Sequence, residues 1–312
     1  MSTVAETEAR PAARPRARRR KPWHWVRRIP FYVLIVLIFI YAVFPFYWAL
    51  RSAFTPDADL FKTPVQYFPA HPTLKQFRDA LGTGEFQHAL INSTIVAGSV
   101  TLIALALGSL AGYALGRFRF RGRSTTLYVM LSMTIFPQIA ILGALYTMIN
   151  GLHIHLLGIG FHTPHIYNSL WALILSYMVL VLPFTVWVLT SFMRALPKDL
   201  EEAAYIDGAT PFQVFYKVLL PLVAPGLVTA GLLAFIAAWN EFLFALSFTE
   251  TPDKRTVPVS LIEFTTGRGG TFEYPWGEVM AATVVVTIPL IVLVLLLQRR
   301  ILAGLTAGAV KG

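Results

Sequence analysis

Long apolar runs alternate with short polar segments along this chain. Six runs are about twenty residues or longer, and together they contain one charged side chain, Glu241. A helix of about 20 apolar residues spans the hydrocarbon core of a membrane, which is roughly 30 Å thick. The pattern therefore predicts an all-α fold, that of a polytopic membrane protein with six transmembrane helices. The predicted spans are Phe31–Leu50, Ile91–Leu115, Thr125–Ile149, Asn168–Ser191, Leu222–Phe248 and Val279–Leu297.

The basic residues are distributed unevenly between the polar segments. Every second segment, starting with the N-terminal one, is rich in Lys and Arg, and these segments hold 19 of the 26 basic residues. Because cytoplasmic segments carry an excess of Lys and Arg, we expect both termini to be cytoplasmic. The first thirty residues alone contain Arg10, Arg14, Arg16, Arg18, Arg19, Arg20, Lys21, Arg27 and Arg28.

The basic N-terminal segment, residues 1–29, is also rich in Ala and Pro, and we expect it to be disordered. Such a tail can bind nucleic acid. Directly before an apolar span, it more simply fixes the cytoplasmic side and attracts anionic lipid. We therefore expect membrane lipid, and no nucleic acid, as its partner. We expect residues 30–300 to form one six-helix domain and residues 301–312 to form a cytoplasmic tail.

The composition excludes several classes of chemistry. Hydrophobic residues make up 56% of the chain and charged residues 13%, about half the charge of a typical soluble domain. There is no cysteine, and the motifs of P-loop ATPases, zincin proteases and serine hydrolases are absent. We therefore expect no enzyme activity and no resident cofactor. Four histidines of the predicted external loop have no carboxylate or cysteine among them, so we expect no metal site there. These are His153, His155, His162 and His165.

The segment 196–221 is the one charged, amphipathic stretch between two predicted spans. Asp199 is placed to cap a short helix, with Glu202 reaching back to the start of that helix. Gly208 stands where the helix should end, because glycine adopts the left-handed conformation at almost no cost. Thr210 and Gln213 predict a capping box for a second helix. The pattern indicates two short helices with a glycine corner between them.

This segment also carries a specific motif. Glu202-Ala203-Ala204 is followed after three residues by Gly208, and after nine more by Val218-x-Leu220-Pro221. The spacing resembles the EAA loop of the permease subunits of ABC importers, with Val218 where isoleucine is commonest. The alternative, a soluble helix-turn-helix that binds DNA, is disfavoured because both flanks enter apolar spans.

The resemblance implies a cytoplasmic coupling helix that docks into a cleft on a separate ATPase subunit. ATP would then be bound by a dimer of that partner, and this chain would need no cofactor of its own. The residues that the resemblance assigns to the contact are Glu201, Glu202, Ala203, Ala204, Asp207 and Gly208.

Two further segments narrow the resemblance to the MalG-like carbohydrate permeases. The C-terminal stretch from Gly304 is similar to a tail that, in that family, reaches between the two ATPase subunits. The external segment Thr249–Glu278 corresponds to a loop that enters the sugar-binding protein. The tail residues implied are Gly304, Thr306, Gly308 and Lys311, and the loop residues are Gly267, Gly269 and Gly270.

Glu241 and the adjacent Asn240 are candidates for a gate or cavity. A carboxylate at the centre of a span costs about 2.5–3.5 kcal/mol on insertion scales, so it should face protein or water. The alternative is a structural hydrogen-bond anchor between helices. Gly108, Gly112 and Gly116 repeat every four residues, and we expect this stripe to let another helix approach closely.

These expectations combine into one function. The resemblance implies a permease subunit of a binding-protein-dependent ABC importer in a bacterial or archaeal inner (plasma) membrane. The cargo would be a sugar, a di- or oligosaccharide such as maltose or trehalose. A second homologous permease and an extracytoplasmic sugar-binding protein would complete the complex. Two alternatives remain: an importer for another small solute such as glycerol phosphate, and a channel or membrane scaffold that needs no ATPase.

Overall fold

The computed structural model describes the backbone of residues 28–151, 153–156, 159–162, 165–266 and 274–309, and side chains within 28–151, 165–264 and 274–299. The chain divides into two units, residues 1–48 and 49–312, and each is described by itself. The described part of the first unit is most of helix α2 (Ile29–Ala53), which contains the first predicted span.

The second unit is built around two long helices packed against each other. Helix α5 (Gly84–Arg117) contains the second predicted span, and helix α8 (Leu170–Ala195) contains the fourth except for its first two residues. The two helices approach each other closely along the predicted glycine stripe. A Cβ on Gly112 would lie 3.1 Å from the backbone nitrogen of Thr190, and one on Gly108 would lie 2.9 Å from Cγ2 of Thr185. The stripe is therefore a helix-packing surface, as expected.

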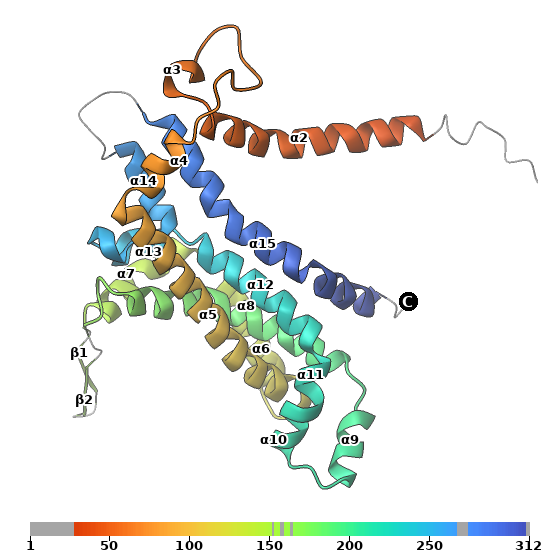
Figure 1. Cartoon of the computed structure of the whole chain (residues 1–312). Helices are drawn as coiled ribbons and strands as arrows, with labels where there is room; N and C mark the ends of the chain where they lie inside the picture. The colour runs from red at the N-terminus through yellow and green to blue at the C-terminus, as the bar shows by residue number, and fades with distance from the viewer. Residues whose placement is uncertain (1–27, 152, 157–158, 163–164, 267–273, 310–312) are drawn as a thin grey trace, which may run out of the picture. The chain divides into compact units, whose positions relative to one another are not determined.

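In Figure 1, helix α12 (Ala224–Trp239) lies beside α5, and helix α15 (Trp276–Ala309) lies beside α12 on the side away from α5. The main buried cluster joins α5, α8 and α12 to the short helix α13 (Leu243–Phe248). Its largest fully buried side chains are Tyr177, Leu173, Trp239, Phe244 and Phe248. Helix α15 continues through the expected boundary at residue 300 to Ala309.

The third predicted span is broken into two helices, α6 (Arg123–Ile135) and α7 (Gln138–Ile149), with a bend of 99° between them. The break lies at Phe136 and Pro137. Proline lacks the amide hydrogen that would continue the helix and disfavours helical geometry in the residue before it. Phe136 is accordingly extended, with ψ of 132°.

The fifth predicted span is also interrupted. Helix α12 ends at Trp239 and α13 begins at Leu243, so residues 240–242 separate them. A second bend, of 75°, precedes α12. Within the described residues, four helices are long and apolar enough to cross a membrane, or up to six if each bent pair is one span. The elements that lead into α12 are α10 (Pro211–Gln213), the π-helix η1 (Val214–Leu219) and α11 (Leu220–Leu222).

The predicted external segments contain structure that the all-α expectation did not include. Strands β1 (His153–Leu156) and β2 (Ile159–His162) form an antiparallel hairpin, with His153 paired to His162. The side chains of the hairpin lie outside the described set. The other external elements are helical: α3 (Asp57–Leu60), α4 (Lys75–Leu81), η2 (Pro252–Lys254) and α14 (Val257–Thr266). Over the residues that the structure describes, the fold is therefore helical apart from one hairpin.

Candidate functional site

The predicted coupling segment contains one exposed helix, α9 (Asp199–Ile206), and its start differs from the prediction by one residue. Lys198, not Asp199, is the N-cap, because the carbonyl of Lys198 accepts hydrogen bonds from the amides of Glu201 (2.9 Å) and Glu202 (3.1 Å). The predicted cap at Asp199 is therefore wrong, since that residue already lies inside the helix. Its carboxylate and those of Glu201 and Glu202 occupy the first turn, where negative charge is favourable next to the positive end of the helix dipole.

Gly208 forms the predicted corner at the end of α9. Its φ is +81°, in the left-handed region. The amide of Gly208 donates to the carbonyl of Tyr205 (3.0 Å), and the amide of Ala209 donates to the carbonyl of Ala204 (3.0 Å). These two bonds are the Schellman motif. A Cβ at Gly208 would meet no described atom within 4 Å, so the requirement for glycine comes from the backbone conformation.

The second helix begins with the predicted capping box. The amide of Gln213 donates to Oγ1 of Thr210 (3.3 Å), and the amide of Thr210 donates to Oε1 of Gln213 (2.8 Å). These reciprocal bonds satisfy two amides that have no partner within the helix. The prediction of a helix, a glycine corner and a capped second helix is confirmed.

The part of the segment after the corner packs into the helical bundle. The ring centroid of Tyr113, on α5, lies 5.1 Å from that of Phe215, and the Tyr113 hydroxyl donates to the carbonyl of Pro211 (3.4 Å). A cluster of buried side chains surrounds this contact. It consists of Tyr113, Met193, Val214, Phe215, Leu219 and Val223, with Ala204 of α9 packed against its edge.

Arg117, the last residue of α5, holds the start of the coupling segment. Its guanidinium forms an ion pair with Glu201 of α9 and donates to the carbonyls of Leu196 (3.1 Å) and Pro197 (3.3 Å). The side chains of Arg117 and Glu201 are 5% and 13% exposed. Glu201 therefore faces the bundle. Sequence reasoning missed Arg117 as a site residue because it treated the basic loop only as a sign of membrane orientation.

The other residues assigned to the contact with the ATPase divide into two groups. Glu202, Ala203, Asp207 and Gly208 are exposed, whereas Ala204 is partly buried. Ile206, which was not predicted as a site residue, is 86% exposed, more than any other large apolar residue that the structure describes. The exposed surface of α9 therefore combines carboxylates with apolar residues, of which Ile206 is more exposed than Leu200 and Tyr205.

Glu241 lies at the break between α12 and α13, and its side chain is 7% exposed. It accepts hydrogen bonds from Gln138 Nε2 (2.6 Å) and from the amides of Phe244 (2.8 Å) and Ala245 (3.1 Å). The carboxylate thus caps α13 and ties it to the start of α7, as a hydrogen-bond anchor does. Asn240 is exposed, and its Nδ2 donates to the carbonyl of Ile236 (2.8 Å).

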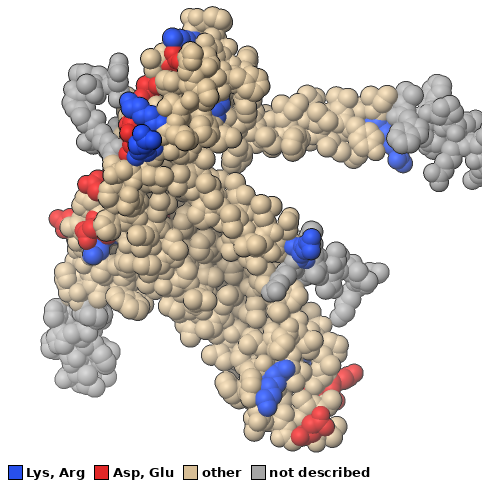
Figure 2. Space-filling model, viewed as in Figure 1, with Lys and Arg blue, Asp and Glu red and all other residues tan. Residues whose placement is uncertain are grey.

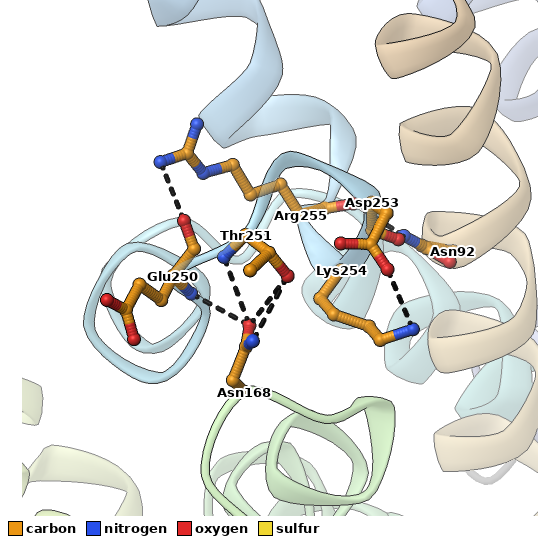
Figure 3. Close-up of polar contacts among 7 residues, drawn as sticks. All are labelled: Asn92, Asn168, Glu250, Thr251, Asp253, Lys254 and Arg255. Carbon is orange, nitrogen blue, oxygen red and sulfur yellow. Dashed lines mark hydrogen bonds and ion pairs between the residues drawn. The ribbon is translucent and has the colours of Figure 1, made fainter.

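A polar bracket holds the predicted external segment at the other end of α5 (Figure 3). Asn168 Oδ1 accepts from the amides of Glu250 (2.9 Å) and Thr251 (3.2 Å), and Asn92 Nδ2 donates to the carbonyls of Asp253 (2.8 Å) and Arg255 (2.9 Å). Thr251 and Lys254 hold the pKa of the Asp253 carboxyl below its usual value by hydrogen bonding. The bracket fixes the first part of the connection between α13 and α15.

The remaining predicted site residues have no described side chains. The loop glycines Gly267, Gly269 and Gly270 and the tail residue Lys311 lie outside the described residues. Gly304, Thr306 and Gly308 lie on the described backbone of α15. In Figure 2, the charged side chains of the second unit gather toward its ends, and the surface between them is largely uncharged. That distribution suits helices surrounded by lipid.

Comparison with known proteins gives the family directly. Residues 104–306 match the model of the family described as "Binding-protein-dependent transport system inner membrane component". The chain is 40% identical over 289 residues to the trehalose/maltose transport system permease protein MalG of Thermococcus litoralis, which covers 92% of this chain and 98% of the relative. It is 39% identical over 280 residues to the trehalose transport system permease protein SugB of Mycobacterium tuberculosis, covering 90% and 96%.

A solved structure supports the fold. A chain of a bacterial ABC transporter that imports the polysaccharide alginate superposes with a TM-score of 0.73 at 19% identity, covering 89% of this chain and 98% of that one. The expected resemblance to carbohydrate permeases is confirmed by the sequence relatives. This chain belongs to the family of binding-protein-dependent transport system inner membrane components, and it is a multi-pass permease subunit that is not itself an ATPase.

Proposed function

We propose that this permease subunit carries a di- or oligosaccharide of the trehalose and maltose class across the inner membrane. The observation that carries the proposal is the identity of about two residues in five, over nine-tenths of the chain, to relatives named for trehalose and maltose transport. The match to the family model, over residues 104–306, includes the whole coupling segment. In this proposal a separate ATPase dimer supplies the energy.

Helix α9 is the proposed contact with that ATPase. Its residues Glu202, Ala203 and Ile206 are exposed, and the glycine corner and the buried Tyr113–Phe215 contact hold the helix in place. The surface is suited to a cleft that offers an apolar floor and basic or amide groups at its rim. In this proposal α9 and both termini lie in the cytoplasm. Gly304, Thr306, Gly308 and Lys311 form a second contact with the ATPase in this proposal.

The remaining partners follow from the same complex. A second homologous permease completes the translocation path, and an extracytoplasmic sugar-binding protein delivers the sugar. Gly267, Gly269 and Gly270 contact that binding protein in the proposal, and the polar bracket at Asn168 and Asn92 supports their segment. Anionic lipid surrounds the basic N-terminal segment.

Asn240 is the proposed cavity-facing residue at the break of the fifth predicted span. Its amide is exposed at a point where the helix is interrupted, and an exposed polar group inside a span faces a path or a partner more readily than lipid. Glu241 beside it holds the break through its three hydrogen bonds. The two adjacent residues thus have separate roles, one toward the cavity and one toward the helices.

Uptake by cells tests the assignment of the cargo. A strain lacking this gene should lose uptake of radiolabelled trehalose or maltose, and the gene on a plasmid should restore it. Uptake of glycerol 3-phosphate should not change. Loss of glycerol 3-phosphate uptake with normal uptake of both sugars would overturn the sugar assignment.

Purification tests the assembly. A tagged chain, extracted in mild detergent, should bring down an ATPase subunit and a second permease. A lone homo-oligomer that conducts solute without ATP would instead identify a channel and contradict the proposal.

A further inference from the structure

The end of α5 is joined to the coupling segment by a contact that the local sequence does not suggest. Arg117 reaches three groups of this segment, namely the carboxylate of Glu201 and the carbonyls of Leu196 and Pro197. The two carbonyls lie 79 and 80 positions away along the chain. One guanidinium therefore binds both the residues that precede α9 and the first turn of that helix.

This contact differs from an ordinary surface ion pair. Exposed pairs contribute little to stability because water screens them and the side chains lose freedom. Here both side chains are largely buried, and the guanidinium geometry allows several hydrogen bonds at once. Removal of one partner would leave the other as an unpaired, mostly buried charge, which is strongly unfavourable.

The end of α5 that carries Arg117 is itself held firmly. Arg123 donates to the carbonyls of Leu115 (2.6 Å) and Gly116 (2.9 Å), and Arg194 of α8 donates to the carbonyl of Leu115 (3.3 Å). These carbonyls belong to the last turn of α5, where basic side chains are favourable. The last turn of α5 is therefore held together, and a displacement of Arg117 would move this end of the helix as a unit.

Helix α5 passes such a displacement on to α8 through close contact. A Cβ on Gly116 would lie 2.8 Å from Cβ of Met193, and one on Gly112 would lie 3.1 Å from the backbone nitrogen of Thr190. Little space separates the two backbones along this face, and packed interiors shift between discrete arrangements rather than deform gradually. Movement of α5 should carry α8 with it.

We propose that Arg117 is a positioning residue that transmits the movement of α9 into α5 and α8. Motion of the ATPase then enters the bundle by two routes. One is the chain itself, which continues from α9 through residues 196–198 to α8 and through Gly208 to α12, and the other is the ion pair of Arg117 with Glu201, which leads to α5. This inference rests on the proposed function, because it assumes that α9 docks on an ATPase.

The test compares sugar uptake with ATP hydrolysis in the complete importer, reconstituted in proteoliposomes with its binding protein and trehalose. In Arg117→Gln, the number of trehalose molecules imported per ATP should fall at least about fivefold, the lower end of the usual range for coupling between sites. ATP hydrolysis itself should continue. Arg121→Gln is the matched control, since Arg121 is exposed in the basic segment that follows Arg117. This variant should import as many trehalose molecules per ATP as the wild type.

A double-mutant cycle separates a specific link from general damage. Glu201→Gln should lower the ratio in the same way, and the double variant Arg117→Gln/Glu201→Gln should be no worse than the poorer single variant, because both remove one interaction. If the fold-losses of the two single variants simply multiply in the double variant, the proposal is overturned. A normal number of trehalose molecules imported per ATP in Arg117→Gln would also overturn it.

The wild-type complex distinguishes failure of the proposed function from failure of the proposed role of Arg117. If the wild-type chain neither purifies with an ATPase nor imports trehalose with ATP, the proposed function itself fails. If the wild type is active and Arg117→Gln behaves like Arg121→Gln, only the role of Arg117 fails. Should Arg117→Gln not reach the membrane, Glu201→Gln decides, because it leaves both carbonyl bonds of Arg117 in place; normal coupling in that variant would overturn the proposal.

Discussion

Gln138 donates a hydrogen bond of 2.6 Å to Glu241, and each residue lies where a predicted membrane span is broken. Gln138 is the first residue of α7, just after the bend at Pro137, and Glu241 lies between α12 and α13. The bond therefore joins two helix interruptions that are 103 positions apart in the chain. The breaks in the third and fifth predicted spans are therefore linked directly by this hydrogen bond.

Glu241→Ala should destabilise the protein strongly. The change leaves Gln138 Nε2 and the amides of Phe244 and Ala245 without their acceptor, and each buried unsatisfied donor costs about 1–3 kcal/mol. Thermal unfolding in detergent would show the loss. The neighbouring Asn240→Ala should change stability little, because Asn240 is exposed. Equal midpoints for the two variants would show that Glu241 anchors nothing.

Gly112→Ala should be destabilising and Gly98→Ala should not, although both residues lie on α5. A Cβ at position 112 would meet the backbone of α8, which cannot move aside easily, whereas one at position 98 meets no described atom within 4 Å. In the open position alanine should gain about 0.5–1 kcal/mol from helix propensity. Comparison of the two unfolding midpoints checks this, and a lower midpoint for Gly98→Ala than for Gly112→Ala would be evidence against close packing of α5 on α8.

Gly208→Ala should weaken coupling through the backbone alone. The left-handed conformation at φ of +81° costs an L-residue roughly 1–2 kcal/mol. Asparagine tolerates this conformation better, so Gly208→Asn should retain more uptake than Gly208→Ala. Gly122, with φ of +90° and no described atom near its Cβ, supplies the control. Gly122→Ala should lose similar stability but retain coupling; equal uncoupling in both alanine variants would argue against a special role for the corner after α9.

Local chemistry made parts of the coupling segment predictable. Thr210 and Gln213 form their capping box, and Gly208 ends a helix, because the responsible groups lie within a few residues of one another. The start of α9 was misplaced by one residue for a related reason. Lys198 adopts helical angles, and its carbonyl, rather than the Asp199 side chain, organises the first turn.

Tertiary contacts were not predictable in the same way. The contact of Arg117 with Glu201 depends on how α5 and α8 pack, and a single sequence does not show which arginine of a basic loop lies near which carboxylate. Pro137 accounts for a break in the helix, but the residue type alone does not set the angle of 99°. Gln138 carried no signal at all, since an uncharged polar residue after a proline is unremarkable in a membrane helix.

Asn168→Ala should loosen the polar bracket at the external end. Asn168 has a φ of +56°, and its side chain accepts from the amides of Glu250 and Thr251. Hydrogen exchange at these two amides should accelerate in both Asn168→Ala and Asn168→Gly, because both lose the acceptor. Only the alanine variant should also bear the left-handed penalty of about 1–2 kcal/mol. Unchanged exchange at Glu250 and Thr251 would contradict the role of Asn168.

The most direct test of the account is the partner of Ile206 in the living cell. Ile206 is 86% exposed at the end of α9, and a photo-crosslinking amino acid there should capture whatever docks on that helix. The same probe at Tyr128, which is exposed on the membrane helix α6, serves as the control. In a variant that still imports sugar, the account predicts an adduct with the ATPase subunit from position 206 and none from position 128. An adduct with an extracytoplasmic protein, or a functional variant without any ATPase adduct, would contradict it.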